Sequence, residues 1–126
     1  MNLLLDTHVF LWAIDNSPRL SPQARAAITD GNNLVFVSAA TAWEIAIKRG
    51  IGKLTTPSDD YLDELRVHRF TSLDITATHA LAVEKLPHYH NDPFDRLLIA
   101  QAQIEKFVLV TGDARIKQYA VQIIET

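Results

Sequence analysis

Four short runs of apolar, β-branched or aromatic residues recur along the chain, and in each run the apolar positions are nearly continuous rather than alternating. Runs of this kind are typical of strands that are buried on both faces of a parallel sheet. A fifth and shorter run, Val121 to Ile124, is expected to add one more strand. The first four runs are Leu3 to Leu5, Leu34 to Val37, Phe70 to Leu73 and Phe107 to Val110.

Between these runs lie segments with the apolar spacing of helices and with residues that favour helix starts. Ser21 offers an N-cap with Pro22 at the first helical position, and Ser58 precedes a segment with acids in its first turn. Thr41 and Glu44 have the spacing of a capping box. Strands that alternate with helices predict an α/β fold, a three-layer α/β/α sandwich with a central parallel sheet of four to five strands.

Length, cysteine content and charge narrow the class of protein. The 126 residues are expected to form one domain, residues 1–126, around one core. The chain has no cysteine, which excludes disulfides, thiolate zinc sites and cysteine nucleophiles and makes a reducing cytoplasm the simplest location. The first residues do not resemble a signal peptide, and no apolar stretch approaches the roughly 18 residues that span a bilayer. A net charge of −3 does not suggest the basic face that usually binds nucleic acid.

Carboxylates stand where the predicted strands end. Asp6 follows the first strand, and Asp113 follows the fourth. Asp92 and Asp95 open the helix that leads into the fourth strand, and such a helix starts near the carboxyl edge because it runs antiparallel to the strand. Glu44 lies one to two turns into the helix after the second strand. Since ligands of parallel α/β sheets bind beyond the carboxyl ends of the strands, these acids are expected to face one another.

Each acid also has a purely structural interpretation. Asp92 before a proline is a good N-cap, which puts Asp95 at the third helical position, where an acid benefits from the helix dipole. Asp74 and Asp113 can each cap a helix that follows them. Asp6 has the weakest structural explanation, because a carboxylate that closes a buried strand needs a partner.

Taken together, the acids point to a bound cation. Asp6, Glu44, Asp95 and Asp113 at one edge would repel one another by roughly 1 to 4 kcal/mol per close pair, at effective dielectric constants of about 80 to 20. A cation or shared protons must offset this repulsion, and no lysine or arginine directly follows a strand. A cluster of oxygen ligands selects a hard cation, Mg²⁺ or Mn²⁺, over zinc.

Four stretches of the chain, in this order and spacing, resemble the PIN-domain ribonucleases and in particular the VapC-type toxins of bacterial toxin–antitoxin pairs. The stretches are "LLLDTHVFLW", "SAATAWEIAIKRGIGKL", "DPFDRLLIAQA" and "LVTGDARIKQY", and the resemblance covers essentially the whole chain. It implies that the family's catalytic, metal-binding acidic quartet falls on Asp6, Glu44, Asp95 and Asp113. Asp92, Thr7 and Thr111 are expected to support these acids or the water around the metal.

The resemblance further implies metal-dependent endonucleolytic cleavage of RNA, with one or two Mg²⁺ or Mn²⁺ ions that activate a water molecule and neutralise the scissile phosphate. It also implies a cytoplasmic homodimer and an antitoxin protein as partner. Because the metal supplies positive charge, a protein of net charge −3 can still bind a phosphodiester. Candidate RNA contacts are the basic residues near the acids: Lys48, Arg49, Arg96 and Arg115.

Other residues whose side chains could coordinate a metal or stack on bases are expected to have structural roles. His8, His79, His88 and His90 are not needed as ligands and are expected on the surface or in the core, with His8, two residues from Asp6, as the exception to watch. Trp12 and Trp43 are expected in the core or in a dimer contact rather than as platforms for bases.

Alternative functions remain open at this point. A receiver-type domain would need paired acids after the first strand, and a haloacid-dehalogenase-like phosphatase a second acid two residues after Asp6, where His8 stands. The stronger alternatives are a PIN-like RNA-binding or protein-interaction module without catalysis, and a nuclease directed at DNA. The target RNA depends on the shape of the binding site and on base stacking, which the sequence leaves undetermined.

Overall fold

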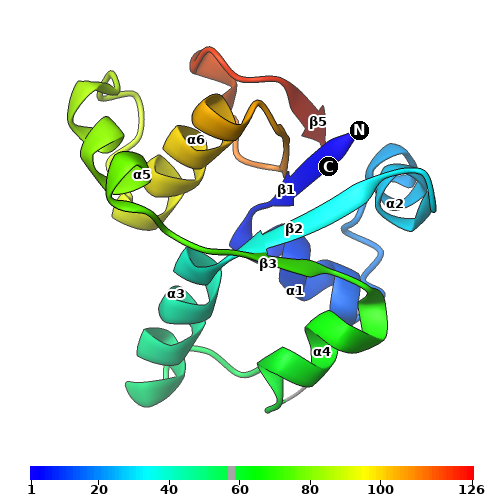
Figure 1. The fold of residues 1–126 in the computed structure, drawn as a ribbon. Helices are drawn as coiled ribbons and strands as arrows, with labels where there is room; N and C mark the ends of the chain where they lie inside the picture. Colours follow the sequence, from blue (N-terminus) through cyan, green and yellow to red (C-terminus); the bar gives the residue numbers. More distant parts are fainter. Residues whose placement is uncertain (57–58) are drawn as a thin grey trace.

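The computed structural model describes residues 1–56 and 59–126 and contains a five-stranded sheet in which every pair of neighbours is parallel. The spatial order is β3-β2-β1-β4-β5, with β1 at the centre (Figure 1). All five strands occur where the apolar runs predict them, within one or two residues at their ends. The strands are β1 (Asn2–Leu5), β2 (Leu34–Ser38), β3 (Thr71–Leu73), β4 (Val108–Thr111) and β5 (Ile123–Glu125).

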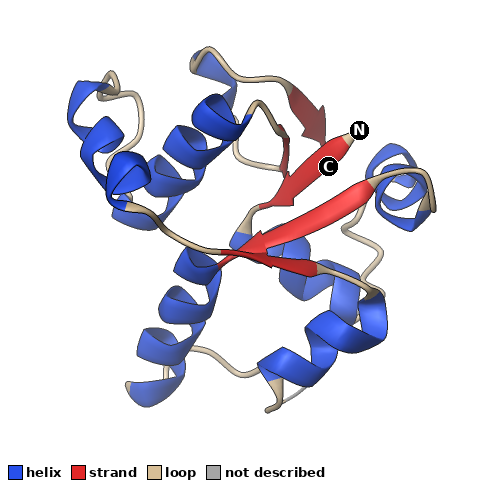
Figure 2. Cartoon of the chain, in the orientation of Figure 1, coloured by secondary structure: helices blue, strands red, loops and turns tan. Residues whose placement is uncertain are grey.

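Helices connect the strands on both sides of the sheet (Figure 2). Two 3₁₀ turns, η1 (Val83–Lys85) and η2 (Ile116–Gln118), add to them. In the described part of the chain the α-helices are α1 (Thr7–Ile14), α2 (Pro22–Thr29), α3 (Ala39–Gly50), α4 (Tyr61–His68), α5 (Ala77–Ala82) and α6 (Pro93–Glu105).

The sheet separates two apolar layers, as expected for a three-layer α/β/α fold. On β1, Leu3 and Leu5 pack into one layer with α1, α2 and α4, while Leu4 between them packs into the other with α5 and α6. All three leucines are fully buried. Burial on both faces explains why the strand sequences are continuously apolar.

The order of strands creates a switch point between β1 and β4. The chain builds outward from β1 through β2 to β3 and then returns to the other side of β1 to form β4. Leu5 pairs with Val37 on one side and with Val110 on the other, so the three strands end at the same level. Residues that follow β1 and β4 therefore meet where parallel α/β sheets commonly bind ligands.

The structure corrects two predicted helix starts. Helix α3 begins at Ala39 with Ser38 as N-cap, so Thr41 and Glu44 lie inside the helix and the predicted capping box is wrong. The cap of α5 is Thr76, not Asp74. At α3 the two side chains with the spacing of a capping box are used elsewhere, because Thr41 and Glu44 both contact the hydroxyl of Thr7.

Three further predictions about helix starts have separate outcomes. The start at Ser21 and Pro22 is confirmed, since the Ser21 side chain accepts the backbone N–H of Ala24. The predicted start at Ser58 lies outside the described residues, and the N-cap of α4 is Asp60. Asp113 caps no α-helix, because a 3₁₀ turn follows it.

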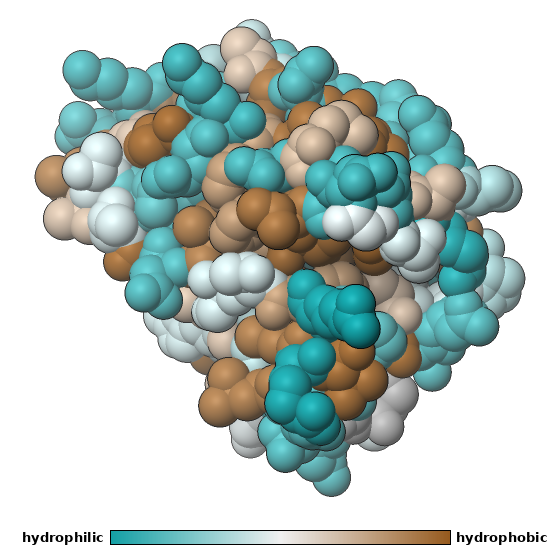
Figure 3. All heavy atoms as spheres, turned by 45° about the vertical axis from the view of Figure 1, so that its right-hand side comes forward, coloured by the Kyte–Doolittle hydropathy of each residue, from teal (hydrophilic) through white to brown (hydrophobic). Residues whose placement is uncertain are grey.

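Apolar side chains also reach the surface. Figure 3 shows them between polar side chains across one face of the molecule. Large apolar side chains are exposed at Trp43 and Ile47 on α3 and at its C-cap, Ile51. Trp43 is 58% exposed, which excludes the core as its position, while a dimer contact stays a prediction. Within the described part of the chain, no helix has the length and apolar character needed to cross a membrane.

Candidate active site

Asp6 closes β1 and is almost fully buried, with 4% of its surface exposed. Its Oδ1 accepts the backbone N–H of Val9 at 2.8 Å, which makes Asp6 the N-cap of α1. Its Oδ2 accepts a hydrogen bond from the hydroxyl of Thr111, at the end of β4. Burial raises the pKa of Asp6 above its usual value, although both hydrogen bonds act in the opposite direction. The carboxylate is thus held in one orientation at the switch point.

Asp113 follows β4 and lies beside Asp6. Its backbone N–H donates to the hydroxyl of Thr111 at 3.0 Å, so one threonine orients both acids. Nε and Nη2 of Arg115 donate to the two carboxylate oxygens, each at 3.2 Å. Partial burial raises the pKa of Asp113, but hydrogen bonds from Arg115 and His90 outweigh burial and hold that pKa below its usual range.

Asp92 and Asp95 stand at the start of α6, and their predicted positions as N-cap and third helical residue are confirmed. The backbone N–H of Asp95 donates to Oδ1 of Asp92 at 3.0 Å. Burial, followed by the charges of Asp92, Asp6, Glu44 and Asp113, raises the pKa of Asp95 to about 7. Acids from four separate segments therefore act electrostatically on one carboxyl group.

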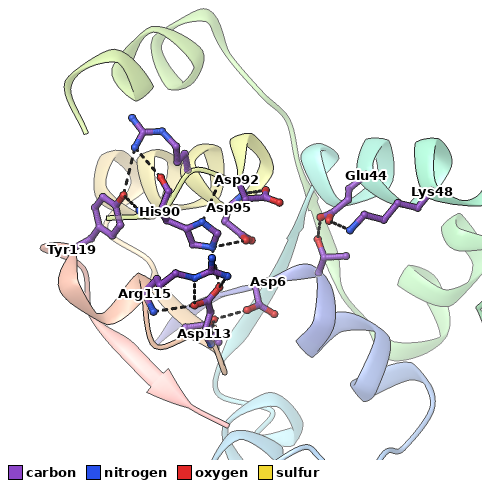
Figure 4. A network of polar contacts seen from close by, with 12 residues as sticks. Asp6, Glu44, Lys48, His90, Asp92, Asp95, Asp113, Arg115 and Tyr119 are labelled. Atoms are coloured by element: carbon purple, nitrogen blue, oxygen red, sulfur yellow. Dashed lines mark hydrogen bonds and ion pairs between the residues drawn. The ribbon is translucent and has the colours of Figure 1, made fainter. Parts of the chain in front are cut away.

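Glu44 faces the site from α3 and is itself buried. Its Oε1 accepts the hydroxyl of Thr7 at 2.7 Å, and its Oε2 pairs with Nζ of Lys48 at 2.6 Å. The hydrogen bond to Glu44 raises the pKa of Lys48. Figure 4 places Glu44 and Lys48 on one side of the site, with the other acids gathered opposite them.

His90 is a site residue that the sequence analysis missed. Its Nε2 lies 2.8 Å from Oδ2 of Asp113 and 3.0 Å from Oδ2 of Asp95, and its side chain is only 2% exposed (Figure 4). One atom from each of these three side chains lies within 4.8 Å of the others, close enough to surround a metal ion. His90 lies in a loop without apolar periodicity, so no local pattern in the sequence indicated that it faces these acids.

A hollow of about 230 Å³ is lined by Glu44, Lys48, His90, Asp92, Asp95, Asp113 and Arg115. A neighbouring hollow of about 440 Å³ shares His8, Asp95 and Asp113 with it and extends to Asp6. A more voluminous hollow, about 540 Å³, lies by the end of α2 and the start of β2, but most of its lining is apolar or uncharged. The chemistry therefore belongs to the smaller, acidic hollow, with His8 at its rim.

The candidate RNA contacts divide into two groups. Lys48 and Arg115 line the acidic hollow. Arg49 instead lines a separate small hollow with Thr56, to which its guanidinium donates a hydrogen bond. Arg96 is only 6% exposed, so its proposed contact with RNA is corrected: the side chain is buried in the protein.

Arg96 has a structural role. Its guanidinium donates to the backbone carbonyls of Val83, Leu86, Pro87 and His90 at 2.8 to 3.3 Å. Arg96 thereby attaches the segment before α6 to the helix. Adjacent residues on a helix point in different directions, which is why Asp95 faces the hollow and Arg96 faces this segment.

The fold and the acidic hollow agree with one family. The PIN domain model matches residues 3–122 of this chain. The chain belongs to the PIN domain family.

Individual relatives share nearly the full length of the chain. It is 33% identical over 120 residues to Ribonuclease VapC22 of Mycobacterium tuberculosis (strain ATCC 25618 / H37Rv), which covers 93% of this chain and 91% of that protein. Among solved structures, VapBC2 from Rickettsia felis bound to a promoter DNA fragment has a TM-score of 0.73 at 19% identity, covering 99% and 98% of the two chains. A toxin–antitoxin complex from Klebsiella pneumoniae has a TM-score of 0.66 at 17% identity, covering 97% and 95%. At these identities the two structures share the fold.

Proposed function

We propose that this chain is an endoribonuclease that depends on Mg²⁺ or Mn²⁺ and acts as the toxin of a toxin–antitoxin pair. The observation that carries the proposal is the convergence of Asp6, Glu44, Asp95 and Asp113 on two neighbouring hollows that share Asp95 and Asp113. Glu44 and Asp113 have basic partners, Lys48 and Arg115, but Asp95 has a pKa raised to about 7 by burial and by the other acids. Perturbation of this kind in a hollow is typical of functional sites.

The donor set fits a hard divalent cation. Asp95 and Asp113 offer oxygens close to one another, and Asp6 lines the same connected hollow. Asp6, Asp95 and Asp113 would hold the ion, and Glu44 would orient a second ion or a water molecule from the α3 side. When bound, the ion supplies Lewis acidity toward the phosphodiester and lowers the pKa of a water molecule.

The protein's own residues would position the RNA. Lys48 and Arg115 lie at the hollow, where the cationic group of each can contact a phosphate. Thr7 and Thr111 hold Glu44 and Asp6 through hydroxyl hydrogen bonds, so the carboxylates are oriented before substrate binds. A fixed orientation is needed because small displacements of catalytic groups strongly reduce the reaction rate.

The assignment as a toxin is supported by the relatives. VapC22 is named a ribonuclease, and the structure from Klebsiella pneumoniae is a toxin–antitoxin complex. By this likeness we propose that an antitoxin protein binds this chain. From the resemblance in sequence to VapC-type toxins we further propose that two copies form a homodimer and that the protein acts in the cytoplasm.

The test is cleavage of RNA by the purified protein and by two variants, Asp6→Asn and Asp95→Asn, each with Mg²⁺, with Mn²⁺ and with excess EDTA. Asp15→Asn is the matched control, because Asp15 is exposed at the end of α1. We expect cleavage by the unaltered protein and by the control in the presence of metal, and a loss of at least about 100-fold in either site variant.

Three results would contradict the proposal. Cleavage that persists in excess EDTA would show that the reaction does not require a divalent cation. RNA binding without new RNA ends would favour an RNA-binding module without catalysis. Faster cleavage of single-stranded DNA than of RNA with the same base sequence would favour a DNA nuclease.

A further inference from the structure

His90 is placed to act on two of the proposed metal ligands at once. Its imidazole lies between Asp95, at the start of α6, and Asp113, after β4, with Nε2 within hydrogen-bond distance of one oxygen of each (Figure 4). The ring can serve the site in two ways. It can coordinate the cation through Nε2, or it can donate an N–H hydrogen bond to the carboxylates that do.

The other ring nitrogen distinguishes these two roles. The backbone N–H of Asp92 donates to Nδ1 of His90 at 3.1 Å, so Nδ1 is an acceptor and carries no proton. In a neutral imidazole the proton is then on Nε2, which makes Nε2 a donor toward Asp95 and Asp113. Coordination through Nε2 would move the proton to Nδ1. The ring N–H would then face the backbone N–H of Asp92, and neither group would have an acceptor.

Both backbone polar groups of His90, its N–H and its carbonyl, are hydrogen-bonded. Its N–H donates to the hydroxyl of Tyr119 at 3.0 Å, and its carbonyl accepts from the guanidinium of Arg96 at 3.3 Å. The Tyr119 hydroxyl in turn donates to the carbonyl of Pro87 at 2.6 Å. These contacts hold the backbone that carries the ring, and a rotation that exchanged the ring nitrogens would break the contacts of Nδ1 with Asp92 and of Nε2 with the two carboxylates.

His90 also differs from the other side chain that donates to Asp113. The side chain of Arg115 is 61% exposed, whereas that of His90 is 2% exposed. Arg115 can move away when a cation or a phosphate arrives, but the buried imidazole stays in place. The lasting hydrogen bond to the carboxylates is the one from His90.

We infer that His90 is a positioning residue, whose Nε2–H orients the carboxylates of Asp95 and Asp113 toward a shared divalent cation without coordinating the cation itself. The inference rests on the proposed metal site. Hydrogen-bonding partners of metal ligands typically contribute 10- to 100-fold in metal affinity.

Two substitutions separate the two nitrogens. His90→Gln can place an amide N–H near the position of Nε2 and so keep the donor to the carboxylates. His90→Asn can place an acceptor near Nδ1 for the N–H of Asp92, but its shorter side chain does not reach the carboxylates. His88→Asn, an exposed histidine two residues earlier, is the control.

The measurement is Mn²⁺ affinity, by titration with detection of free Mn²⁺ by electron paramagnetic resonance, on the full chain without RNA. We expect His90→Asn to bind about 10- to 100-fold more weakly and His90→Gln and His88→Asn to bind close to the unaltered protein. Equal binding by all four proteins, or equal weakening by both His90 variants, would overturn this inference alone. No Mn²⁺ binding by the unaltered protein would overturn the proposed function as well.

A second measurement needs no variant and so does not depend on whether His90→Asn folds. Nitrogen-15 correlation spectra of the histidine rings report which nitrogen carries the proton. We expect the proton of His90 on Nε2, both without metal and with Mg²⁺ bound. A proton on Nδ1 in the Mg²⁺-loaded protein would show direct coordination and overturn the inference.

Discussion

The carboxyl group of Asp95 lies where a negative charge is unfavourable. It is partly buried and lies near four other carboxyl groups, which together raise its pKa to about 7. A carboxyl group whose pKa is higher in the folded than in the unfolded chain binds more protons when folded. The stability of the folded protein is then greatest below the unfolded value, 3.8, and is lost as the pH rises toward 7.

We therefore predict that the metal-free protein melts several degrees lower at pH 8 than at pH 5. Each unit of pKa difference corresponds to about 1.4 kcal/mol, and Asp6, whose pKa burial also raises, acts in the same direction. Asp113 acts in the opposite direction, but only near and below pH 4, because its pKa is lowered. The measurement is thermal unfolding in EDTA across this pH range.

Asp95→Asn is the matched variant for this prediction. It should show a clearly smaller loss of stability between pH 5 and pH 8, and at pH 8 it should melt above the metal-free unaltered protein because repulsion is relieved. Mg²⁺ should reduce the pH dependence of the unaltered protein. If the melting temperature changed equally with pH in both proteins, the result would contradict the claim that neighbouring carboxylates repel Asp95.

At the scale of single residues, the acids could be predicted and His90 could not. Asp6 and Asp113 follow apolar runs that end at one edge of a parallel sheet, and this relation can be inferred from the chain alone. The position of His90 depends on how the loop before α6 is attached to Arg96 and Tyr119. These contacts join segments that no local pattern connects.

At the scale of elements, helix α6 positions the site and Arg96 holds the preceding segment to it. The Arg96 guanidinium makes hydrogen bonds to four backbone carbonyls and lies 3.4 Å from the Tyr119 hydroxyl. Lysine cannot reproduce this planar arrangement of donors. A buried carbonyl left without a donor costs about 1 to 3 kcal/mol.

We predict that Arg96→Lys lowers the free energy of unfolding by about 3 kcal/mol, measured by urea denaturation. The control is Arg66→Lys, because Arg66 is 75% exposed in a surface pair with Asp63 and should change stability by less than about 0.5 kcal/mol. An Arg96→Lys variant that is as stable as the unaltered protein but binds RNA more weakly would instead support the original assignment of Arg96 as an RNA contact.

Helix starts show where local signals were insufficient. Thr41 and Glu44 have the spacing of a capping box, but α3 begins earlier, at Ala39, and Glu44 pairs with Thr7 and Lys48. The spacing of two residues cannot tell a cap from a pair of side chains used by a site. The start of α6 was predicted correctly because Asp92 and Pro93 favour the same boundary.

At the scale of the whole molecule, the alternation of strands and helices was sufficient to predict the three layers. The order of strands was not predictable from this pattern, because any of the continuous apolar runs could form the central strand. That order places the ends of β1 and β4 side by side and so creates the site. With a net charge of −3, the molecule as a whole does not attract a polyanion such as the proposed RNA substrate.

We predict that binding of metal-free protein to single-stranded RNA has a shallow dependence on salt. The described basic side chains at the acidic hollows are Arg19, Lys48 and Arg115, and three phosphate contacts give a slope of log K against log salt of about −2. The measurement is fluorescence anisotropy in EDTA, starting at low salt. Lys48→Gln and Arg115→Gln should each reduce the slope by about 0.7, whereas a slope of about −5 would indicate a basic face elsewhere.

Above all, we propose that Asp6, Asp95 and Asp113, from three distant segments, together hold one divalent cation, with Glu44 facing it from α3. The most direct measurement is the anomalous scattering of Mn²⁺ soaked into crystals of the protein. We predict a peak about 2.0 to 2.3 Å from carboxylate oxygens of both Asp95 and Asp113, in the hollow that Asp6 also lines. Crystals saturated with Mn²⁺ that have no peak at these carboxylates, or a peak only at other residues, would contradict the claim.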